Sequence, residues 1–255
     1  MIECGSLEFA QARLQARHGQ RVDEAAWRRI VAMREFAAFL ELARSTVLRP
    51  WLVGVTADSS VHQIEAALRG HWRALVDEVV TWMPGPWQPA LAWCAVLTDL
   101  APLQHLARGG EPAAWMHDDR AWRELCAAQP QARAAMLAAG PLAALAVAWP
   151  TPQTMAQAWQ AEWQRRLPKP LSADDDTLGQ VVRVLLDHRK AFAEAAPGQG
   201  WLLRSSLRVR LTLLLRRAAL EPAAAFIHLA LCALDLERLR AELLRRALFP
   251  RWKGA

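Results

Sequence analysis

Residues 60–86 read SVHQIEAALRGHWRALVDEVVTWMPGP, and this stretch indicates the class of fold. Its apolar residues recur at steps of three and four, which places them on one face of a helix and excludes the alternation of a half-buried strand. Ser60 and Gln63 have the spacing of a capping box, and Pro84-Gly85-Pro86 is expected to end the helix. The stretch therefore predicts one long amphipathic helix.

The same pattern continues along the chain and predicts an all-α protein with almost no strand. We interpret residues 1–255 as a single helical domain with lobes, because the breaks near 109–110, 168–176 and 197–200 are short turns. One helix is expected to begin at the cap Asp23 and run toward Leu40. Further helices are predicted at about 7–18, where Ser6 is the expected cap, and at about 87–108, 118–128, 131–148, 153–167, 177–195, 201–220 and 222–248.

The composition suits a folded chain in a reducing compartment. Of 255 residues, 53% are hydrophobic and 22% are charged, which suffices for a sizeable core and excludes disorder. The nearest two of the four cysteines, Cys94 and Cys126, are 32 positions apart, so the chain has no C-x-x-C pair. The start of the chain lacks the pattern of an export signal, and we expect a cytosolic protein.

One segment has some membrane character. Residues 134–149 are uncharged, but they are rich in alanine, contain Gly140-Pro141 and are followed by Pro150. They fall short of the strongly apolar run that a membrane-spanning helix needs. A buried helical hairpin is therefore favoured over a membrane helix.

No catalytic signature is present, so we predict neither an enzyme nor a cofactor. Phosphate-binding loops, dinucleotide fingerprints, the G-x-S-x-G motif and the H-E-x-x-H motif are all missing. Residues 117–119 (His-Asp-Asp) could be half of a metal site, but a role at a helix start is favoured because neighbours on a helix point in different directions. For 174–176 (Asp-Asp-Asp), a helix-start loop is favoured over calcium. His228 is interpreted as a hydrogen-bonded core histidine rather than a proton relay.

The end of the chain is basic and supplies the candidate interface. From Arg204 onward there are eleven basic and four acidic residues. Such a segment suits anionic lipid heads, an acidic partner or a plain solvated face, whereas nucleic acid would need a recognition helix or stacking aromatics that we do not find. The thirteen tryptophans are attributed mainly to packing, and one near the end of the chain suits an interface. The candidate interface residues are Arg204, Arg208, Arg216, Arg217, Arg245, Arg246 and Trp252.

A weak internal repeat accompanies these patterns. Residues 97–103 (LTDLAPL) resemble 233–239 (ALDLERL), and 185–191 (LLDHRKA) form a poorer third copy. Each copy places an aspartate within an apolar helical stretch, as a quasi-repeated helical unit requires. Pro102 interrupts the first copy, where we expect a kink or a break.

Three stretches resemble the C subunit of the bacterial and archaeal V/A-type rotary ATPases, a central-stalk protein whose eukaryotic counterpart is the V-ATPase d subunit. Residues 7–19 (LEFAQARLQARHG), followed by 36–40 (FAAFL), are similar to the opening helix of that family and its next element. Residues 96–109 are similar to a segment that ends each repeat in the family. Residues 213–249 are similar to its last helical pair.

The resemblance implies a pseudo-threefold helical funnel and a non-catalytic role. It implies an adaptor between the proteolipid ring of the membrane sector and the central-stalk rotor subunits, peripheral at the cytoplasmic face of the cell membrane. Such an adaptor meets the membrane surface only indirectly, binds no nucleic acid and carries no cofactor or metal. The chain is shorter than the family leads us to expect, and the last two copies of the repeat lie closer together than the first two. We therefore expect the funnel to be incomplete. The alternative is a helical scaffold with another protein partner.

Overall fold

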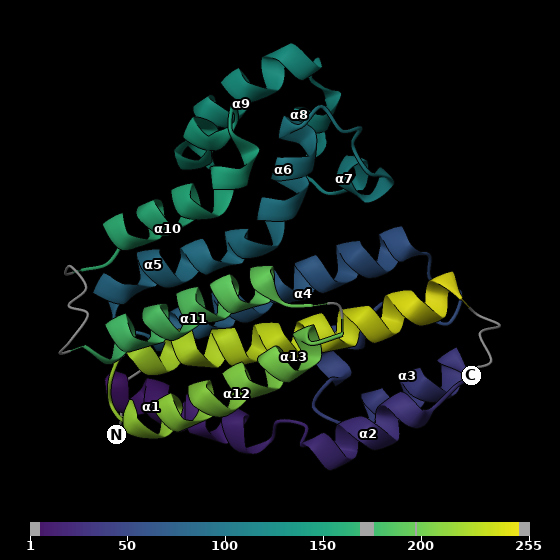
Figure 1. Ribbon diagram of the computed structural model, residues 1–255, viewed down its shortest axis with the longest axis vertical. Coiled ribbons are helices and arrows are strands. Elements are labelled where there is room, and N and C mark those ends of the chain that lie inside the picture. The colour runs from purple at the N-terminus through teal and green to yellow at the C-terminus, as the bar shows by residue number, and fades with distance from the viewer. Residues whose placement is uncertain (1–5, 169–175, 197, 250–255) are drawn as a thin grey trace. The chain divides into compact units, whose positions relative to one another are not determined.

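The computed structural model describes residues 6–168, 176–196 and 198–249 (Figure 1). Within these residues there are thirteen α-helices, six short 3-10 segments and no strand. The all-α prediction is therefore confirmed. The funnel and the quasi-threefold arrangement stay predictions.

The long helix predicted from residues 60–86 is α4, Val61–Trp82. Its capping box is formed, because the Ser60 N–H donates to Gln63 Oε1 over 2.8 Å and the Gln63 N–H donates to Ser60 Oγ over 3.3 Å. The helix ends before the predicted proline and glycine triplet, and the Gln88 side chain donates to the Met83 carbonyl over 2.9 Å. Local chemistry thus determines both ends of this helix.

Side-chain caps also start three other helices. Ser6 accepts from the Phe9 N–H at the start of α1, Leu7–Gly19. Asp23 caps α2, Glu24–Ala32, and Asp176 caps α11, Thr177–Glu194. The caps at Ser6 and Asp23 were predicted, and the helix-start role of the 174–176 segment is confirmed for Asp176. The other two aspartates of that segment lie outside the described residues.

The prediction of one helix from Asp23 toward Leu40 is wrong in one respect, because the structure has a break in the middle of this segment. Met33 is extended (ψ 113°), so α2 ends at Ala32 and α3 begins anew at Phe36, Phe36–Arg44. The carbonyls at the break keep partners, since Arg246 Nη2 donates to Val31 over 3.0 Å and to Met33 over 2.7 Å. A distant arginine replaces the helical hydrogen bonds that the break removes.

The prediction of a single helix over residues 87–108 is also wrong. The structure divides this region into η2 (Gly85–Trp87), α5 (Gln88–Ala92), η3 (Trp93–Asp99) and α6 (Leu100–Ala107). The break lies just before Pro102, which occupies the third position of α6. Because the first N–H groups of a helix have no intrahelical partner, a proline is tolerated there.

The helices predicted over 118–128 and 131–148 are shorter than expected. Asp119 is extended and ends α7, and Gly140 is extended and ends α9, so that the 134–149 window folds as a hairpin of α9 and a 3-10 segment. Among the described residues, no helix is long and apolar enough to cross a membrane. The elements of this region are α7 (Ala114–Asp118), α8 (Arg123–Ala127), η4 (Pro130–Ala132), α9 (Arg133–Ala139), η5 (Ala143–Ala148), η6 (Pro152–Thr154) and α10 (Met155–Arg165).

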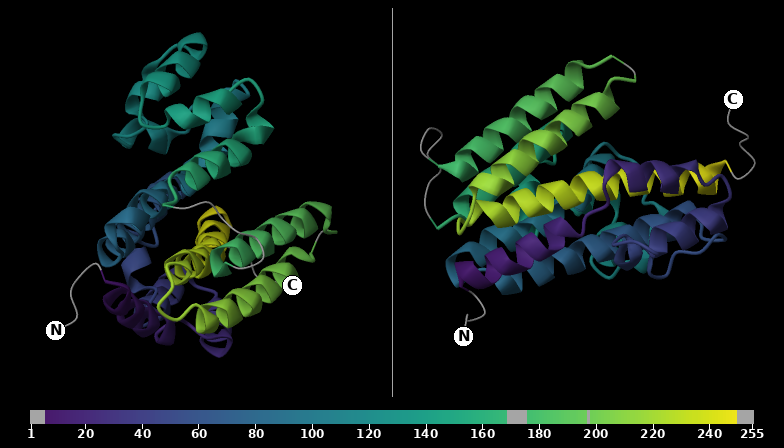
Figure 2. Two further views of the ribbon diagram at one scale, coloured as in Figure 1. Left: turned by 90° about the vertical axis from the view of Figure 1, so that its left-hand side faces the viewer. Right: turned by 90° about the horizontal axis from the view of Figure 1, so that it is seen from below.

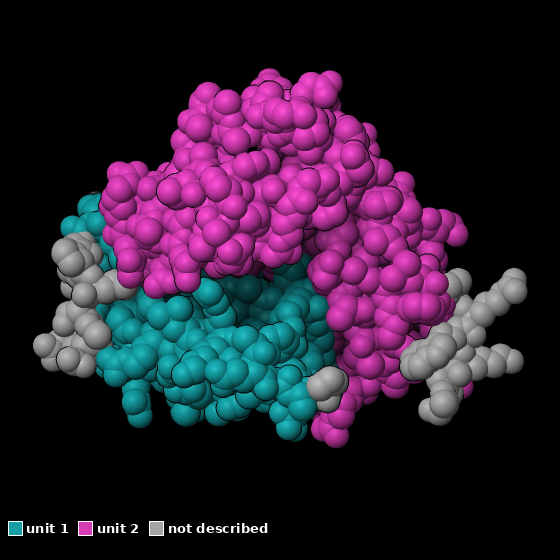
Figure 3. Space-filling model, turned by 45° about the horizontal axis from the view of Figure 1, so that its top comes forward, with its two compact units in different colours: residues 1–21, 76–92, 167–239 teal, residues 22–75, 93–166, 240–255 magenta. Residues whose placement is uncertain are grey.

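The chain forms two compact units, coloured separately in Figure 3. Unit 1 comprises residues 1–21, 76–92 and 167–239, and unit 2 comprises residues 22–75, 93–166 and 240–255. Two of the five boundaries fall inside α4 and α13, Ala223–Leu248, so each of these helices contributes to both units. The predicted single domain with its three lobe breaks stays a prediction.

Unit 1 is built around α1, α11, α12 (Gly200–Arg217) and the first part of α13. Helices α11 and α12 lie side by side as an antiparallel hairpin (Figures 1 and 2). Helix α1 is joined to the end of α4 by the Arg17–Glu78 ion pair (2.5 Å) and by Arg13, which lies 5.3 Å from the ring centroid of Trp82. The core is apolar, with Leu207 and Leu211 of α12 buried.

Unit 2 has a core rich in tryptophan. Trp27 and Trp72 are almost fully buried, and Trp72 Nε1 donates to the Cys94 carbonyl over 3.0 Å. Trp93 and Trp159 each donate to the backbone carbonyl of the other, over 3.0 and 3.1 Å. The attribution of these tryptophans to packing is therefore confirmed.

Candidate functional site

The predicted interface begins with Arg204 and Arg208, and both arginines bind α13. Arg204 Nε donates to Glu237 over 2.6 Å, and its guanidinium lies 4.4 Å from the ring of Phe192. Arg208 Nη1 donates to Asp235 over 2.6 Å. These ion pairs fasten α12 to α13, so both arginines have a structural task, and their interface role stays a prediction.

Asp235 is the centre of this network. Its carboxylate is 7% exposed in the middle of α13 and accepts from Arg21 Nε (2.9 Å) and Arg21 Nη2 (2.6 Å) as well as from Arg208. Arg21 also donates to the Leu231 carbonyl over 3.0 Å. One carboxylate thus joins the end of the α1 segment, α12 and α13. The sequence repeat drew attention to Asp235, but nothing in the sequence indicated its partners.

Asp99 has the corresponding part in unit 2. It is 6% exposed and lies 3.0 Å from Arg73 Nη2 and 3.5 Å from Arg69 Nη1, and Arg73 also donates to Asp119 over 2.7 Å. Burial raises the pKa of Asp99, whereas the two arginines act to lower it. Arg73 therefore holds the Asp119 side chain in place. The Asp119 carboxylate also accepts a hydrogen bond from the Ala121 N–H.

The three copies of the repeat differ in local structure. Asp99 lies where η3 meets α6, Asp235 lies inside α13 and Asp187 lies inside α11. The first two carboxylates are buried and paired with arginines, whereas Asp187 is exposed. The sequence likeness of the two closer copies therefore corresponds to a shared use of a buried aspartate.

Arg246 was predicted at a surface, but the structure buries it. It is 5% exposed, its guanidinium lies 4.0 Å from the ring centroid of Phe39, and it binds Glu242 and the carbonyls at the α2–α3 break. Arg245 is half-buried and donates to Glu242 over 2.8 Å. Arg245 and Arg246 therefore share one carboxylate, that of Glu242.

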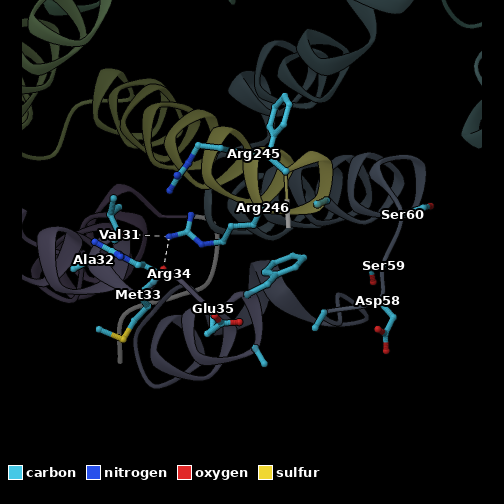
Figure 4. A pocket seen from close by; sticks show the side chains of 15 residues that line it. Val31, Ala32, Met33, Arg34, Glu35, Asp58, Ser59, Ser60, Arg245 and Arg246 are labelled. Atoms are coloured by element: carbon cyan, nitrogen blue, oxygen red, sulfur yellow. Dashed lines mark hydrogen bonds between the residues drawn. The ribbon is translucent and has the colours of Figure 1, made fainter. Parts of the chain in front are cut away.

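A pocket of about 810 Å³ opens beside Arg246 in unit 2 (Figure 4). Its walls are the α2–α3 connection, the segment before α4 and the end of α13. The lining carries both signs of charge, with Arg34, Arg245 and Arg246 on one hand and the carboxylates Glu35 and Asp58 on the other. Among the described residues of the lining there is no histidine or cysteine, and its hydroxyl groups are those of Ser59 and Ser60.

Arg216 and Arg217 are the predicted residues that stay outside such networks. Both are exposed at the end of α12, together with Arg210, which lies about two turns earlier. Neither Arg216 nor Arg217 forms an ion pair with another described residue. Trp252 lies outside the described residues. On α12, the outward basic charge is therefore that of Arg210, Arg216 and Arg217.

His228, which is buried, and Cys232, which is partly buried, form a polar pair in unit 1. His228 Nε2 lies 3.6 Å from Cys232 Sγ, and its Nδ1 has no partner among the described residues. Burial lowers the pKa of His228 to about 4 and raises the pKa of Cys232 to about 12, so both are neutral near pH 7. Among the described residues, no group of three or more histidine, cysteine, aspartate or glutamate side chains could hold a metal ion.

Comparisons with protein families, with curated proteins and with solved structures find no match for this chain.

The role of Asp235 is tested by Asp235→Asn. We expect the free energy of unfolding to fall by roughly 3 kcal/mol, because Arg21 and Arg208 lose a buried counter-charge. Urea denaturation followed by circular dichroism measures the change. Asp187→Asn is the matched control, since it alters the exposed aspartate of the third repeat copy and is expected to change stability by less than about 0.5 kcal/mol. Equal effects of the two substitutions would contradict the assignment.

The neutral state of His228 predicts that the free energy of unfolding depends on pH. Between its ordinary pKa of 6.5 and about 4, the unfolded histidine binds a proton and the buried one does not, so the unfolding free energy should fall as the pH falls. In His228→Leu this part of the dependence should be lost, whereas the exposed His62→Leu should retain it. Urea denaturation at about pH 7 and about pH 5 measures both. Identical pH profiles for the wild type and His228→Leu would rule out this contribution.

Proposed function

We propose that this chain is a non-catalytic central-stalk adaptor of a V/A-type rotary ATPase. In this role it couples the proteolipid ring to the rotor shaft during proton or sodium transport, from a peripheral position at the cytoplasmic face of the cell membrane. The observation that carries the proposal is the likeness of three separate stretches to the C subunit of these ATPases, over 7–19 with 36–40, over 96–109 and over 213–249.

The ion pairs formed by residues in and beside these stretches support the proposal. Asp235 lies in the third stretch and binds Arg21, which closely follows the 7–19 segment of the first stretch. Asp99 lies in the second stretch and binds Arg69 and Arg73 of α4. Their charged side chains thus connect helices within each unit. A body that transmits torque needs such connections, because packed helices with fixed contacts resist deformation.

The exposed arginines supply a second, weaker support. Arg216 and Arg217 lie in the third stretch and face outward. A rotor adaptor close to a membrane would meet anionic lipid heads and acidic protein surfaces, and both attract exposed arginine. The alternative, a helical scaffold with a different protein partner, uses the same surface.

Purification of the tagged full-length chain from membranes in mild detergent tests the proposal. We expect the proteolipid and the central-stalk proteins of a rotary ATPase to copurify, as identified by mass spectrometry. The control is the same tagged chain in cells that lack the membrane-sector genes, where the proteolipid must be absent. Recovery of the chain without proteolipid or stalk proteins would contradict the rotor assignment and leave the scaffold alternative.

The contribution of the exposed arginines is measured in the same assay. Arg216→Glu/Arg217→Glu should reduce copurification, and the wild-type association should weaken as salt is raised, because exposed charges are screened. Arg28→Glu/Arg29→Glu is the matched control, since it reverses another adjacent exposed pair, in unit 2. If both double variants copurify like the wild type, Arg216 and Arg217 are not part of the interface.

A further inference from the structure

Helix α12 has apolar side chains on two opposite sides. Its inner face is buried through residues that include Leu207 and Leu211. On the opposite face, Leu202, Val209 and Leu213 are 71%, 57% and 49% exposed. A helix that is apolar on both sides usually contacts a second surface on the side left open, because large exposed aliphatic residues gain free energy when they are buried.

The exposed residues of α12 follow the spacing of a helix-pairing seam. Leu202, Ser206, Val209 and Leu213 are separated by four, three and four positions, the spacing of core positions in a coiled coil. At 3.6 residues per turn, the three aliphatic side chains lie within a stripe roughly 40° wide. A narrow stripe of this kind fits a single helix laid along α12.

The borders of the seam are basic and lack carboxylates. Arg210, Arg216 and Arg217 lie beside or at the end of the stripe, and none of them forms an ion pair with another described residue. Helix α12 itself contains no aspartate or glutamate. The two arginines that face the core, Arg204 and Arg208, are already neutralised by α13. The charge that is left open is therefore on the seam side.

We propose that the outer face of α12 binds one amphipathic helix of a partner protein. Apolar residues of that helix pack along Leu202, Val209 and Leu213, and acidic residues at its flanking positions pair with Arg210 and Arg217. Flanking charges of opposite sign set partner choice in paired helices. The inference goes beyond the rotary-ATPase proposal and does not depend on it, because it uses only the exposure, spacing and charge of α12.

Two other occupants fit the surface less well. A second copy of this chain would bring arginine-rich α12 against arginine-rich α12, and neither helix carries a carboxylate to offset the repulsion. A membrane surface favours a broad apolar face, whereas here Ser205, Arg210, Arg216 and Arg217 occupy exposed positions beside the stripe. An acidic helix satisfies both the narrow seam and its basic borders.

The test uses the full-length chain and two synthetic helical peptides of about three heptads. Both peptides carry leucine at the seam positions, one with glutamate and the other with lysine at the flanking positions. Fluorescence anisotropy should show that the glutamate peptide binds at least tenfold more tightly than the lysine peptide, a ratio that corresponds to about 1.4 kcal/mol. Arg210→Glu/Arg217→Glu should reverse this preference. A charge reversal that restores binding to the opposite peptide also shows that the variant is folded.

A matched pair of substitutions tests the seam itself. Val209→Glu should weaken binding of the glutamate peptide at least about tenfold, because it places a carboxylate in the apolar stripe. Val147→Glu makes the same change at an exposed valine of unit 2 and should leave binding unchanged. Circular dichroism and thermal unfolding should be the same for both variants and the wild type.

Several outcomes would overturn the proposal. These are equal binding of the two peptides, absence of binding, equal losses in Val209→Glu and Val147→Glu, or dimerisation of the chain that Val209→Glu abolishes. Sedimentation with phosphatidylserine vesicles that Val209→Glu abolishes would assign the surface to a membrane instead. None of these results depends on copurification with a rotary ATPase, so failure of the two proposals can be told apart.

Discussion

The buried carboxylate of Asp235 is the contact on which the arrangement of unit 1 depends. A carboxylate in the middle of a long apolar helix is stable only when its charge is compensated, and here Arg21 and Arg208 supply three hydrogen bonds. The two arginines come from different parts of the chain, so the requirement of one side chain fixes the positions of three segments. Asp99, with Arg69 and Arg73, meets the same requirement in unit 2.

Ion pairs and burial reduce the number of free positive charges in the basic C-terminal region. Counted along the sequence, the region has a large surplus of positive charge and suggests a wide basic face. In the structure, Arg204 and Arg208 bind carboxylates of α13, and Arg246 is buried against Phe39 and Glu242. The basic surface is correspondingly smaller, and on α12 the exposed arginines are Arg210, Arg216 and Arg217.

The helix breaks depend on the same requirement, that buried polar groups have hydrogen-bond partners. Val31 and Met33 expose carbonyls that a continuous helix would have satisfied, and the Arg246 guanidinium binds both. Trp93 and Trp159 similarly exchange indole N–H and carbonyl hydrogen bonds across unit 2. Long polar or amphipathic side chains therefore satisfy backbone groups where the helices stop, and short helices become compatible with a buried setting.

Features that depend on near neighbours could be predicted from the residues alone. The capping pair Ser60 and Gln63, the caps at Ser6 and Asp23, and the stripe of α4 involve groups a few positions apart, and all were found as expected. Asp235 and Arg21 are 214 positions apart, and no local pattern connects them. Which arginines are neutralised, where helices break and which face of α12 stays open follow from packing between distant segments, because a charge or a carbonyl finds its partner only when the chain has folded.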